Sequence, residues 1–149
     1  MITMVDTCPG GLRLARHLAN EAGNEDVRIV QAQGLVSVSI DDCVAELEAL
    51  AHGAHAEKPI VHAIASPQFD FRPAQWEAYW TEFEDEFGMQ GHPFLEVEHL
   101  KFGAGGRTAR HRHRLYLRIG VDGKAVNLSH SAARAEKLSR IAGFMRGEP

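Results

Sequence analysis

The sequence has little of several features that would quickly assign it to a class. Only two of its 149 residues are cysteines, Cys8 and Cys43, and their spacing does not suit a thiolate metal site, so we expect free thiols in a reducing cytoplasm. No apolar run is long enough to span a membrane, and the N-terminus carries neither a basic stretch nor an apolar signal core. We therefore expect one cytoplasmic domain over residues 1–149, long enough to bury a core.

Positive charge is scarce in the first two thirds of the chain. Residues 1–100 contain 5 Lys+Arg against 17 Asp+Glu, whereas residues 101–149 contain 11 against 3. The two parts carry −12 and +8, which together give the net charge of −4. A concentrated basic segment attracts polyanions. The same asymmetry would also arise in a globule whose acidic part neutralises its basic part, and composition does not separate the two.

The hydrophobic periodicity predicts an α+β domain. Its elements follow the order βαβαββα, which is typical of a mostly antiparallel sheet with helices packed on one face. A helical pattern also follows Pro9-Gly10-Gly11, and the aromatic stripe of the helix that begins at Pro73 is predicted to be core. The predicted ranges are strands at 27–30, 60–65, 94–100 and 115–119 and helices at about 41–53, 73–87 and 131–145.

The most informative segment is Gly-Gly-Arg-Thr-Ala-Arg-His-Arg-His-Arg, which ends at Arg114. His111 and His113 lie two residues apart in a strand-like segment, so their side chains share one face of the sheet. His99 ends the preceding predicted strand and would return beside them if the two strands form a hairpin. Three neutral imidazoles bind a divalent cation and leave open positions for a substrate.

Arginines crowd around these histidines. A metal among arginines suggests an anionic substrate, and phosphate is the obvious candidate. Strand alternation, however, points Arg112, Arg114 and Arg118 to the face where core is expected, and three unpaired guanidinium groups cannot be buried there. The strand must therefore twist or bulge, or the arginine face must be open, or acidic residues must pair with it.

Several segments, taken in order, resemble the relaxases, the mobilisation nucleases of plasmids and integrative elements among the His-hydrophobic-His endonucleases. The resemblance is to an alphaproteobacterial-type group and covers nearly the whole chain. The matching segments are residues 9–18 with 24–27 and Gly34, Val61-His62-Ala63-Ile64-Ala65-Ser66-Pro67, Gln75-Trp76, Glu98-His99, His111-Arg112-His113, residues 122–125 and residues 138–140.

The resemblance implies a relaxase-like palm with a central antiparallel sheet and a divalent metal ion, Mg, Mn or Zn, held by His99, His111 and His113. It implies metal-dependent nicking of one DNA strand at an origin of transfer by transesterification, during conjugative plasmid mobilisation. The products would be a covalent protein–5′-phosphate link and a free 3′-hydroxyl. The implied partners are single-stranded or hairpin origin DNA, accessory relaxosome proteins and a coupling protein, in a bacterial cytoplasm. The chain ends soon after its last predicted helix, as the N-terminal part of a longer protein would.

The nucleophile departs from the usual family pattern. Most relaxases use an N-terminal tyrosine, but this chain has only Tyr79, on the aromatic stripe, and Tyr116, at opposite parity to the two strand histidines. A branch with a histidine nucleophile suggests His17, with Tyr116 as the weaker candidate. The alternative is that His17 contacts phosphate or is structural. The resemblance further suggests phosphate contacts for three arginines: Arg16, Arg107 and Arg110.

Three functions therefore compete. The first is a metal-dependent nicking relaxase. The second is a non-catalytic DNA-binding module with the relaxase fold, which the missing N-terminal tyrosine favours. The third is a small metalloprotein unrelated to DNA. Salt-dependent DNA affinity would separate the first two from the third.

Overall fold

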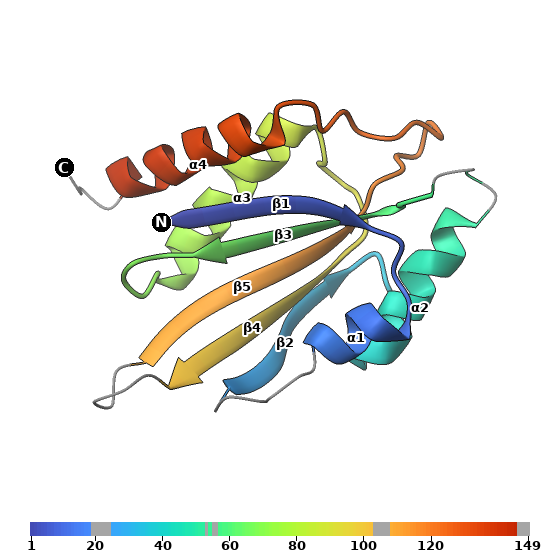
Figure 1. Ribbon diagram of the computed structural model, residues 1–149, viewed down its shortest axis with the longest axis horizontal. Helices are drawn as coiled ribbons and strands as arrows, with labels where there is room; N and C mark the ends of the chain where they lie inside the picture. The colour runs from blue at the N-terminus through green and yellow to red at the C-terminus, as the bar shows by residue number, and fades with distance from the viewer. Residues whose placement is uncertain (19–24, 53, 55–56, 103–107, 146–149) are drawn as a thin grey trace.

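A five-stranded antiparallel sheet forms the centre of the protein, in a computed structural model that describes residues 1–18, 25–52, 54, 57–102 and 108–145 (Figure 1). The strand order is β1-β3-β5-β4-β2, and every neighbouring pair is antiparallel. The strands are β1 (Ile2–Cys8), β2 (Glu25–Gln33), β3 (Ile60–Ser66), β4 (Phe94–Phe102) and β5 (Thr108–Leu117), and the helices are α1 (Leu12–Leu18), α2 (Ile40–Ala51), α3 (Pro73–Phe87) and α4 (Ser131–Met145).

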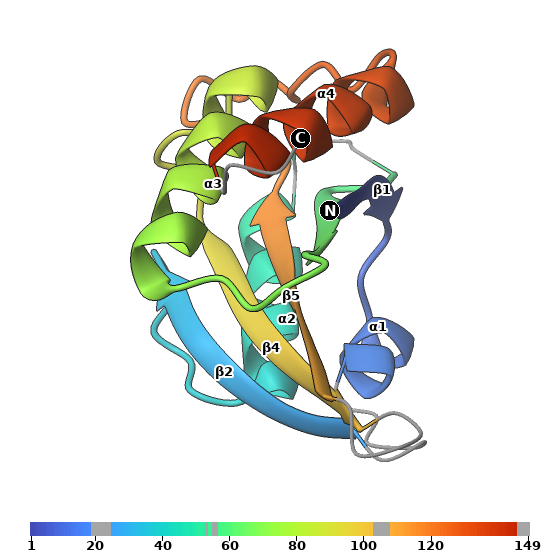
Figure 2. The same ribbon diagram turned by 90° about the vertical axis from the view of Figure 1, so that its left-hand side faces the viewer.

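The predicted α+β class is confirmed, but the helices do not all pack on one face. Helices α1 and α2 bury Leu18 and Leu47 against one face of the sheet, and α3 and α4 bury Phe83 and Leu138 against the other (Figure 2). The reason lies in the strands, because successive residues of β5 such as Leu115 and Tyr116 send apolar side chains to opposite faces. Both faces therefore need a cover.

Three strands differ from their predictions, and one of them, β2, spans Glu25–Gln33 where only 27–30 was predicted. Strand β1 was not predicted, because it lies at the edge of the sheet and its apolar residues Ile2 and Met4 are 65% and 58% exposed, which weakens the alternating pattern. Strand β5 begins at Thr108 and ends at Leu117, so it starts well before the predicted Leu115. The first half of β5 alternates arginine with histidine, so it lacks the apolar alternation by which strands are predicted.

Helix α3 follows its sequence signals closely. Pro73 stands in the first turn, the Gln75 side chain accepts a hydrogen bond from the Arg72 backbone N–H, and Gly88 ends the helix at φ 67°, a left-handed conformation that suits glycine. The aromatic stripe of α3 is buried in the core, as predicted; its members are Trp76, Tyr79, Trp80, Phe83 and Phe87.

The described ranges contain no helix with the length and apolar character needed to cross a membrane. The cysteines are free thiols, with Cys43 buried and Cys8 half-buried. A tight turn follows β5: Ile119 and Ala125 form an isolated β-bridge, Gly120 donates its N–H to the carbonyl of Lys124 at 2.9 Å, and Gly123 adopts φ 77°.

Candidate metal centre

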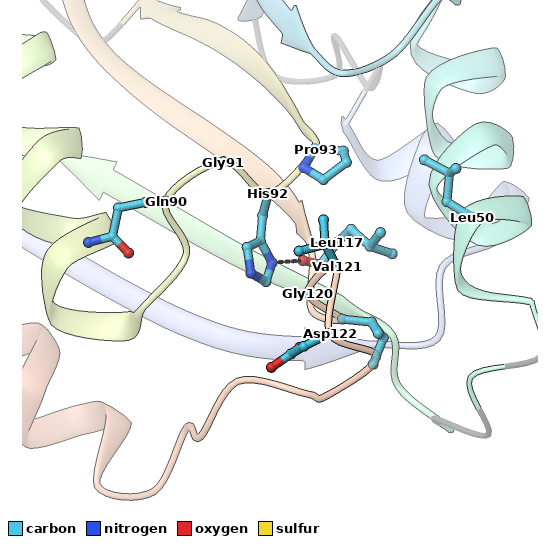
Figure 3. Close-up of a pocket in the computed structure, with 10 residues that line it drawn as sticks. Leu50, Gln90, Gly91, His92, Pro93, Leu117, Gly120, Val121 and Asp122 are labelled. Carbon is cyan, nitrogen blue, oxygen red and sulfur yellow. Dashed lines mark hydrogen bonds between the residues drawn. The ribbon is translucent and has the colours of Figure 1, made fainter.

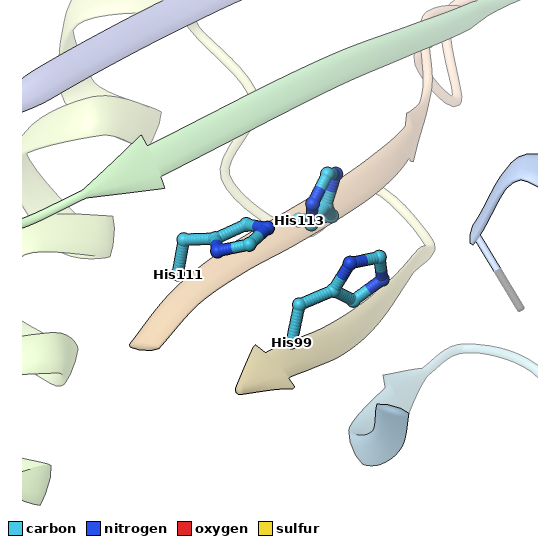
Figure 4. A group of neighbouring side chains, drawn as sticks. All are labelled: His99, His111 and His113. Atoms are coloured by element: carbon cyan, nitrogen blue, oxygen red, sulfur yellow. The ribbon is translucent and has the colours of Figure 1, made fainter. Parts of the chain in front are cut away.

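Three histidines meet on one face of the β4–β5 hairpin (Figure 4). His99 pairs directly with His111 across the two strands, and His113 follows two residues further on the same face. One ring nitrogen from each residue lies within 4.8 Å of the others, and the ring centroids are 4.4 to 5.1 Å apart. The predicted hairpin and the predicted convergence of the three rings are confirmed.

A helix end fixes the ring of His99. The Nε2–H of His99 donates to the carbonyl oxygen of Leu18 at 2.8 Å. Leu18 ends α1, and the last carbonyls of a helix have no partner within it. Because Nε2 carries the proton, Nδ1 keeps its lone pair, and this atom faces the other two rings (Figure 4).

A fourth histidine touches the cluster from β3. The Nε2 of His62 lies 2.8 Å from the Nδ1 of His113, and the two ring centroids are 5.1 Å apart. His62 is half-buried, whereas His99 and His113 are only 3% and 4% exposed. In the sequence, His62 stands out only as part of a relaxase-like segment. The contact was missed because it depends on β3 lying beside β5, a long-range pairing.

The chemistry of the donor set fits a divalent cation. Three neutral imidazoles, two of them buried and one half-buried, offer three nitrogen ligands on one side of an ion and leave the other side for a substrate oxygen. The hydrogen bond to Leu18 is the kind of outer contact that orients a metal-binding histidine. The three residues could therefore hold a metal ion.

The opposite face of the same hairpin carries an ion-pair network. Glu96 stands directly across from Arg114, and Glu98 across from Arg112. Arg112 bridges the two carboxylates, at 2.8 Å to Glu96 and 3.0 Å to Glu98, and Arg28 binds Glu98 at 2.9 Å. Of the three arrangements that the sequence allowed for the arginine face, Arg112 and Arg114 adopt acidic pairing. Arg118 lies just beyond the end of β5, is half-buried, and donates to the carbonyl of Val126 at 3.4 Å.

Helix α3 covers this network with aromatic rings. The guanidinium of Arg112 lies 4.6 Å from the ring centroid of Trp76, and that of Arg114 lies 4.5 Å from Trp80. Arg114 also lies 3.9 Å from the ring centroid of Phe94. Flat guanidinium groups stack on aromatic faces while their edges donate to carboxylates, so these arginines can be buried.

Both tyrosines lie on the network side of the sheet, away from the histidines. The Tyr116 hydroxyl donates to Glu84 at 3.1 Å and accepts from Arg114 at 2.9 Å, and the Tyr79 hydroxyl lies 2.8 Å from the hydroxyl of Thr3. Burial raises the pKa of both phenols far above the ordinary value, and the opposing effect of Arg114 on the pKa of Tyr116 is smaller. Tyr116 is therefore badly placed to attack a phosphate at the histidines.

The structure describes only some of the remaining candidate residues. Arg16 is exposed on α1, the side chain of His17 lies outside the described part of the structure, and Arg107 lies outside it altogether. Arg110 was expected to contact phosphate with the others, but alternation puts it on the network face, where it binds Glu98 at 3.2 Å and lies 3.9 Å from Asp70. The sheet thus separates Arg110 from the three histidines.

A separate cavity lies at the other end of the hairpin, where Phe94 pairs with Tyr116 (Figure 3). Its volume is about 590 Å³, and Leu50, Leu117 and Val121 contribute to its largely apolar wall. His92 lines it and donates from Nδ1 to the carbonyl of Leu117 at 2.7 Å. None of the clustered histidines lines this cavity, so it is distinct from the candidate metal centre.

Comparison with known proteins gives one result. The family model described as relaxase, MobA/VirD2-like, nuclease domain, matches residues 17–142, which is more than half of the chain. This range includes all three clustered histidines. Neither the curated proteins nor the solved structures contain a match.

Proposed function

Because the chain belongs to the MobA/VirD2-like relaxase nuclease family, we propose that it nicks one strand of DNA at an origin of transfer during conjugative plasmid mobilisation. The convergence of His99, His111 and His113 on one face of the β4–β5 hairpin is the observation that carries the proposal. These residues would hold the divalent metal ion on which the reaction depends.

The three ligands bear on the identity of the metal. A bound cation would withdraw charge from a phosphoryl oxygen and make its phosphorus easier to attack. Imidazole nitrogens suit zinc and the later transition metals, whereas magnesium prefers oxygen ligands. We therefore propose zinc ahead of magnesium, with manganese as the intermediate case.

We propose His17 as the nucleophile. Its backbone adjoins Leu18, whose carbonyl accepts the hydrogen bond from His99, so the chain passes beside the metal centre at this point. The neutral ring would attack through its lone pair, forming an N–P bond as the P–O3′ bond breaks. The 3′ oxygen takes up a proton from water and the ring releases its N–H proton. The products are a phosphohistidine link to the 5′ side and a free 3′-hydroxyl.

Two arginines would contact the rest of the bound strand. Arg16 is exposed on α1, the helix that touches His99, and we propose that it binds a phosphate next to the one that is cut. We propose the same for Arg107 from its position in the sequence. Arg110 is engaged by Glu98 on the other face, so we assign it no contact with that phosphate. Single-stranded or hairpin DNA is the substrate proposed, and accessory relaxosome and coupling proteins are the partners.

One observation favours a second function, a DNA-binding module with the relaxase fold that does not cut. Both tyrosines of the chain are buried and hydrogen-bonded in the core between α3 and the sheet, so neither offers the phenol that most relaxases use. If His17 does not react, binding alone would remain.

A nicking assay separates the two functions. The purified protein would be incubated with labelled single-stranded oligonucleotides that tile the DNA flanking its coding sequence, with Mn²⁺, Zn²⁺ or Mg²⁺ and with or without a chelator. A denaturing gel would reveal a labelled covalent adduct, and peptide mapping would identify the modified residue. We expect a chelator-sensitive adduct on His17, which His17→Ala abolishes.

His52→Ala is the matched control, because His52 is an exposed histidine at the end of α2. It should leave the adduct unchanged. DNA binding without any adduct would favour the non-catalytic module, and an adduct on another residue would disprove the role of His17. If neither binding nor adduct is found, the proposed function is wrong.

A further inference from the structure

We propose that His62 is a positioning residue that sets which nitrogen of His113 faces the metal ion. This inference rests on the proposed function, because it assumes that the three-histidine cluster binds a metal. His62 would accept a hydrogen bond from the Nδ1–H of His113, which leaves the Nε2 lone pair of His113 for the ion. His62 is itself not a ligand.

The distance between the two rings separates a hydrogen bond from shared coordination. The Nε2 of His62 and the Nδ1 of His113 are 2.8 Å apart. Two nitrogens bound to one tetrahedral ion, each about 2.0–2.1 Å from it, would lie roughly 3.3 Å apart. At 2.8 Å the pair shares a proton instead. His62 therefore engages the Nδ1 of His113, and Nε2 is the atom that remains for coordination.

The direction of this hydrogen bond follows from the requirement that a metal-binding nitrogen carry no proton. A neutral imidazole carries one N–H, and the nitrogen that binds a metal cannot be the one that carries it. If Nε2 of His113 binds the ion, Nδ1 must hold the proton and donate it, so Nε2 of His62 must accept. Metal-binding histidines commonly donate the other ring N–H to an oxygen acceptor, and here an imidazole takes that place.

His99 shows the same arrangement in mirror order. It donates from Nε2 to the carbonyl of Leu18 and presents Nδ1 to the cluster, whereas His113 would donate from Nδ1 and present Nε2. Two neighbouring ligands are thus held by different acceptors, one from the end of α1 and one from β3. A backbone carbonyl cannot be removed by mutation, but His62 can.

The sheet holds His62 in place for this task. Its backbone pairs with Asp6 on one side and with Leu115 on the other, so the residue sits between two paired strands. On β5, His113 is the partner of Ile64, which makes His62 and His113 diagonal neighbours on the same face. The His62 ring also lies within 30° of parallel to that of His113, so both contacts depend on one side-chain orientation.

The first test needs no variant and no metal. Nitrogen-15 NMR of the ring nitrogens in the metal-free protein reports the tautomer of each histidine, and a coupling across the hydrogen bond would link His113 Nδ1 to His62 Nε2. We expect His113 as the Nδ1–H tautomer, coupled to His62. A His113 ring protonated at Nε2 would overturn the proposal, as would the absence of any coupling between the two rings.

The second test compares two variants by Co²⁺ titration, followed through the visible absorption of the bound ion. His62→Phe keeps a ring of similar size but cannot accept a hydrogen bond, and we expect it to weaken Co²⁺ binding roughly 10- to 100-fold. His62→Gln retains an acceptor oxygen and should restore most of the affinity. Thermal melting of both variants shows whether they are folded. If His62→Phe unfolds, the wild-type NMR result and His62→Gln decide the matter.

Equal Co²⁺ affinity and an unchanged His113 tautomer in folded His62→Phe would refute the positioning role. These readouts are independent of DNA cleavage. If the protein forms no adduct but His62→Phe loses both the Nδ1–H tautomer and the affinity, the nicking function fails while the role of His62 stands. If wild-type protein binds no Co²⁺, the inference falls together with the metal centre.

Discussion

Glu96 and Arg114 face each other across β4 and β5, and Nε of Arg114 donates to the Glu96 carboxylate at 2.7 Å. Their side chains are only 1% and 8% exposed. A buried pair of this kind adds little stability relative to apolar residues, but each charge depends on the other remaining. The hairpin that carries the three histidines is therefore sensitive to any change that leaves one charge alone.

Glu96→Gln should destabilise the protein by about 3 kcal/mol, because two buried arginines each lose one of their two carboxylates: Arg114 keeps only Glu84, at 3.2 Å, and Arg112 keeps only Glu98. Chemical unfolding by urea would measure this. Glu136→Gln is the control, since Glu136 pairs with Arg140 on an exposed helix surface and such pairs contribute about 0.5 kcal/mol. A loss for Glu96→Gln as small as that of the control would contradict the assignment of the network.

Tyr116→Phe should weaken folding and leave the proposed chemistry intact. The change removes a buried hydroxyl bonded to Glu84 and Arg114, at a cost of about 1–3 kcal/mol in the free energy of unfolding. Adduct formation should continue at the wild-type rate under conditions where the variant is folded. Loss of the adduct in a folded Tyr116→Phe protein would revive Tyr116 as the nucleophile.

His111→Ala should remove metal binding with little effect on folding. His111 is half-buried beside His99, and its loss leaves two ligands, so we expect Co²⁺ affinity to fall further than the roughly 10- to 100-fold typical of an outer partner. Isothermal titration would measure it, with His52→Ala as control. An unaffected affinity would mean that the ion, if bound, lies elsewhere.

The free energy of unfolding should fall in acid as Glu98 becomes protonated. Burial raises the pKa of this carboxyl, but hydrogen bonds from Arg28 and Arg112 together outweigh burial and bring the pKa below its ordinary value of 4.5. A lowered pKa means that the stabilisation is complete above the ordinary value and is lost as the pH falls through the folded-state value. Unfolding free energies measured from pH 7 to pH 3 should therefore decline, and Glu98→Gln should flatten the decline.

A pH profile of Glu98→Gln that parallels the wild type would assign the acid sensitivity to other carboxyls. Glu86 is the first alternative, because hydrogen bonds from Lys137 and Arg134 lower its pKa as well. Glu86→Gln would then be the variant that flattens the profile.

Local spacing was enough to predict part of the candidate site. The two-residue interval between His111 and His113 fixes a shared face, and the glycine-rich segment after His99 makes a hairpin the simplest connection, so the triad could be predicted on the condition that the two strands pair. The acidic partners of the arginines share this logic. Glu96 and Glu98 alternate on β4 as Arg114 and Arg112 do on β5, but their pairing depends on a register that the sequence left open.

The remaining features depend on contacts between distant parts of the chain. His62 reaches the cluster only because β3 pairs with β5, and Leu18 reaches His99 only because α1 crosses that end of the sheet. The edge strand β1 was missed for a related reason. Exposed Ile2 and Met4 give a strand too little burial contrast to be recognised without its partner.

Alternate residues of β5 face opposite sides of the sheet, so mutations in this strand fall into two classes. Changes at His111 and His113 would alter the proposed metal centre on one face, and changes at Arg112 and Arg114 would alter the stability of the ion-pair network on the other. An insertion or deletion of one residue inside the strand would exchange these classes, placing guanidinium groups at the proposed metal centre and imidazoles against α3. The fold should therefore tolerate the exchange of one ligand for another in this strand, such as a carboxylate in place of His111. It should not tolerate a change in the length of the strand.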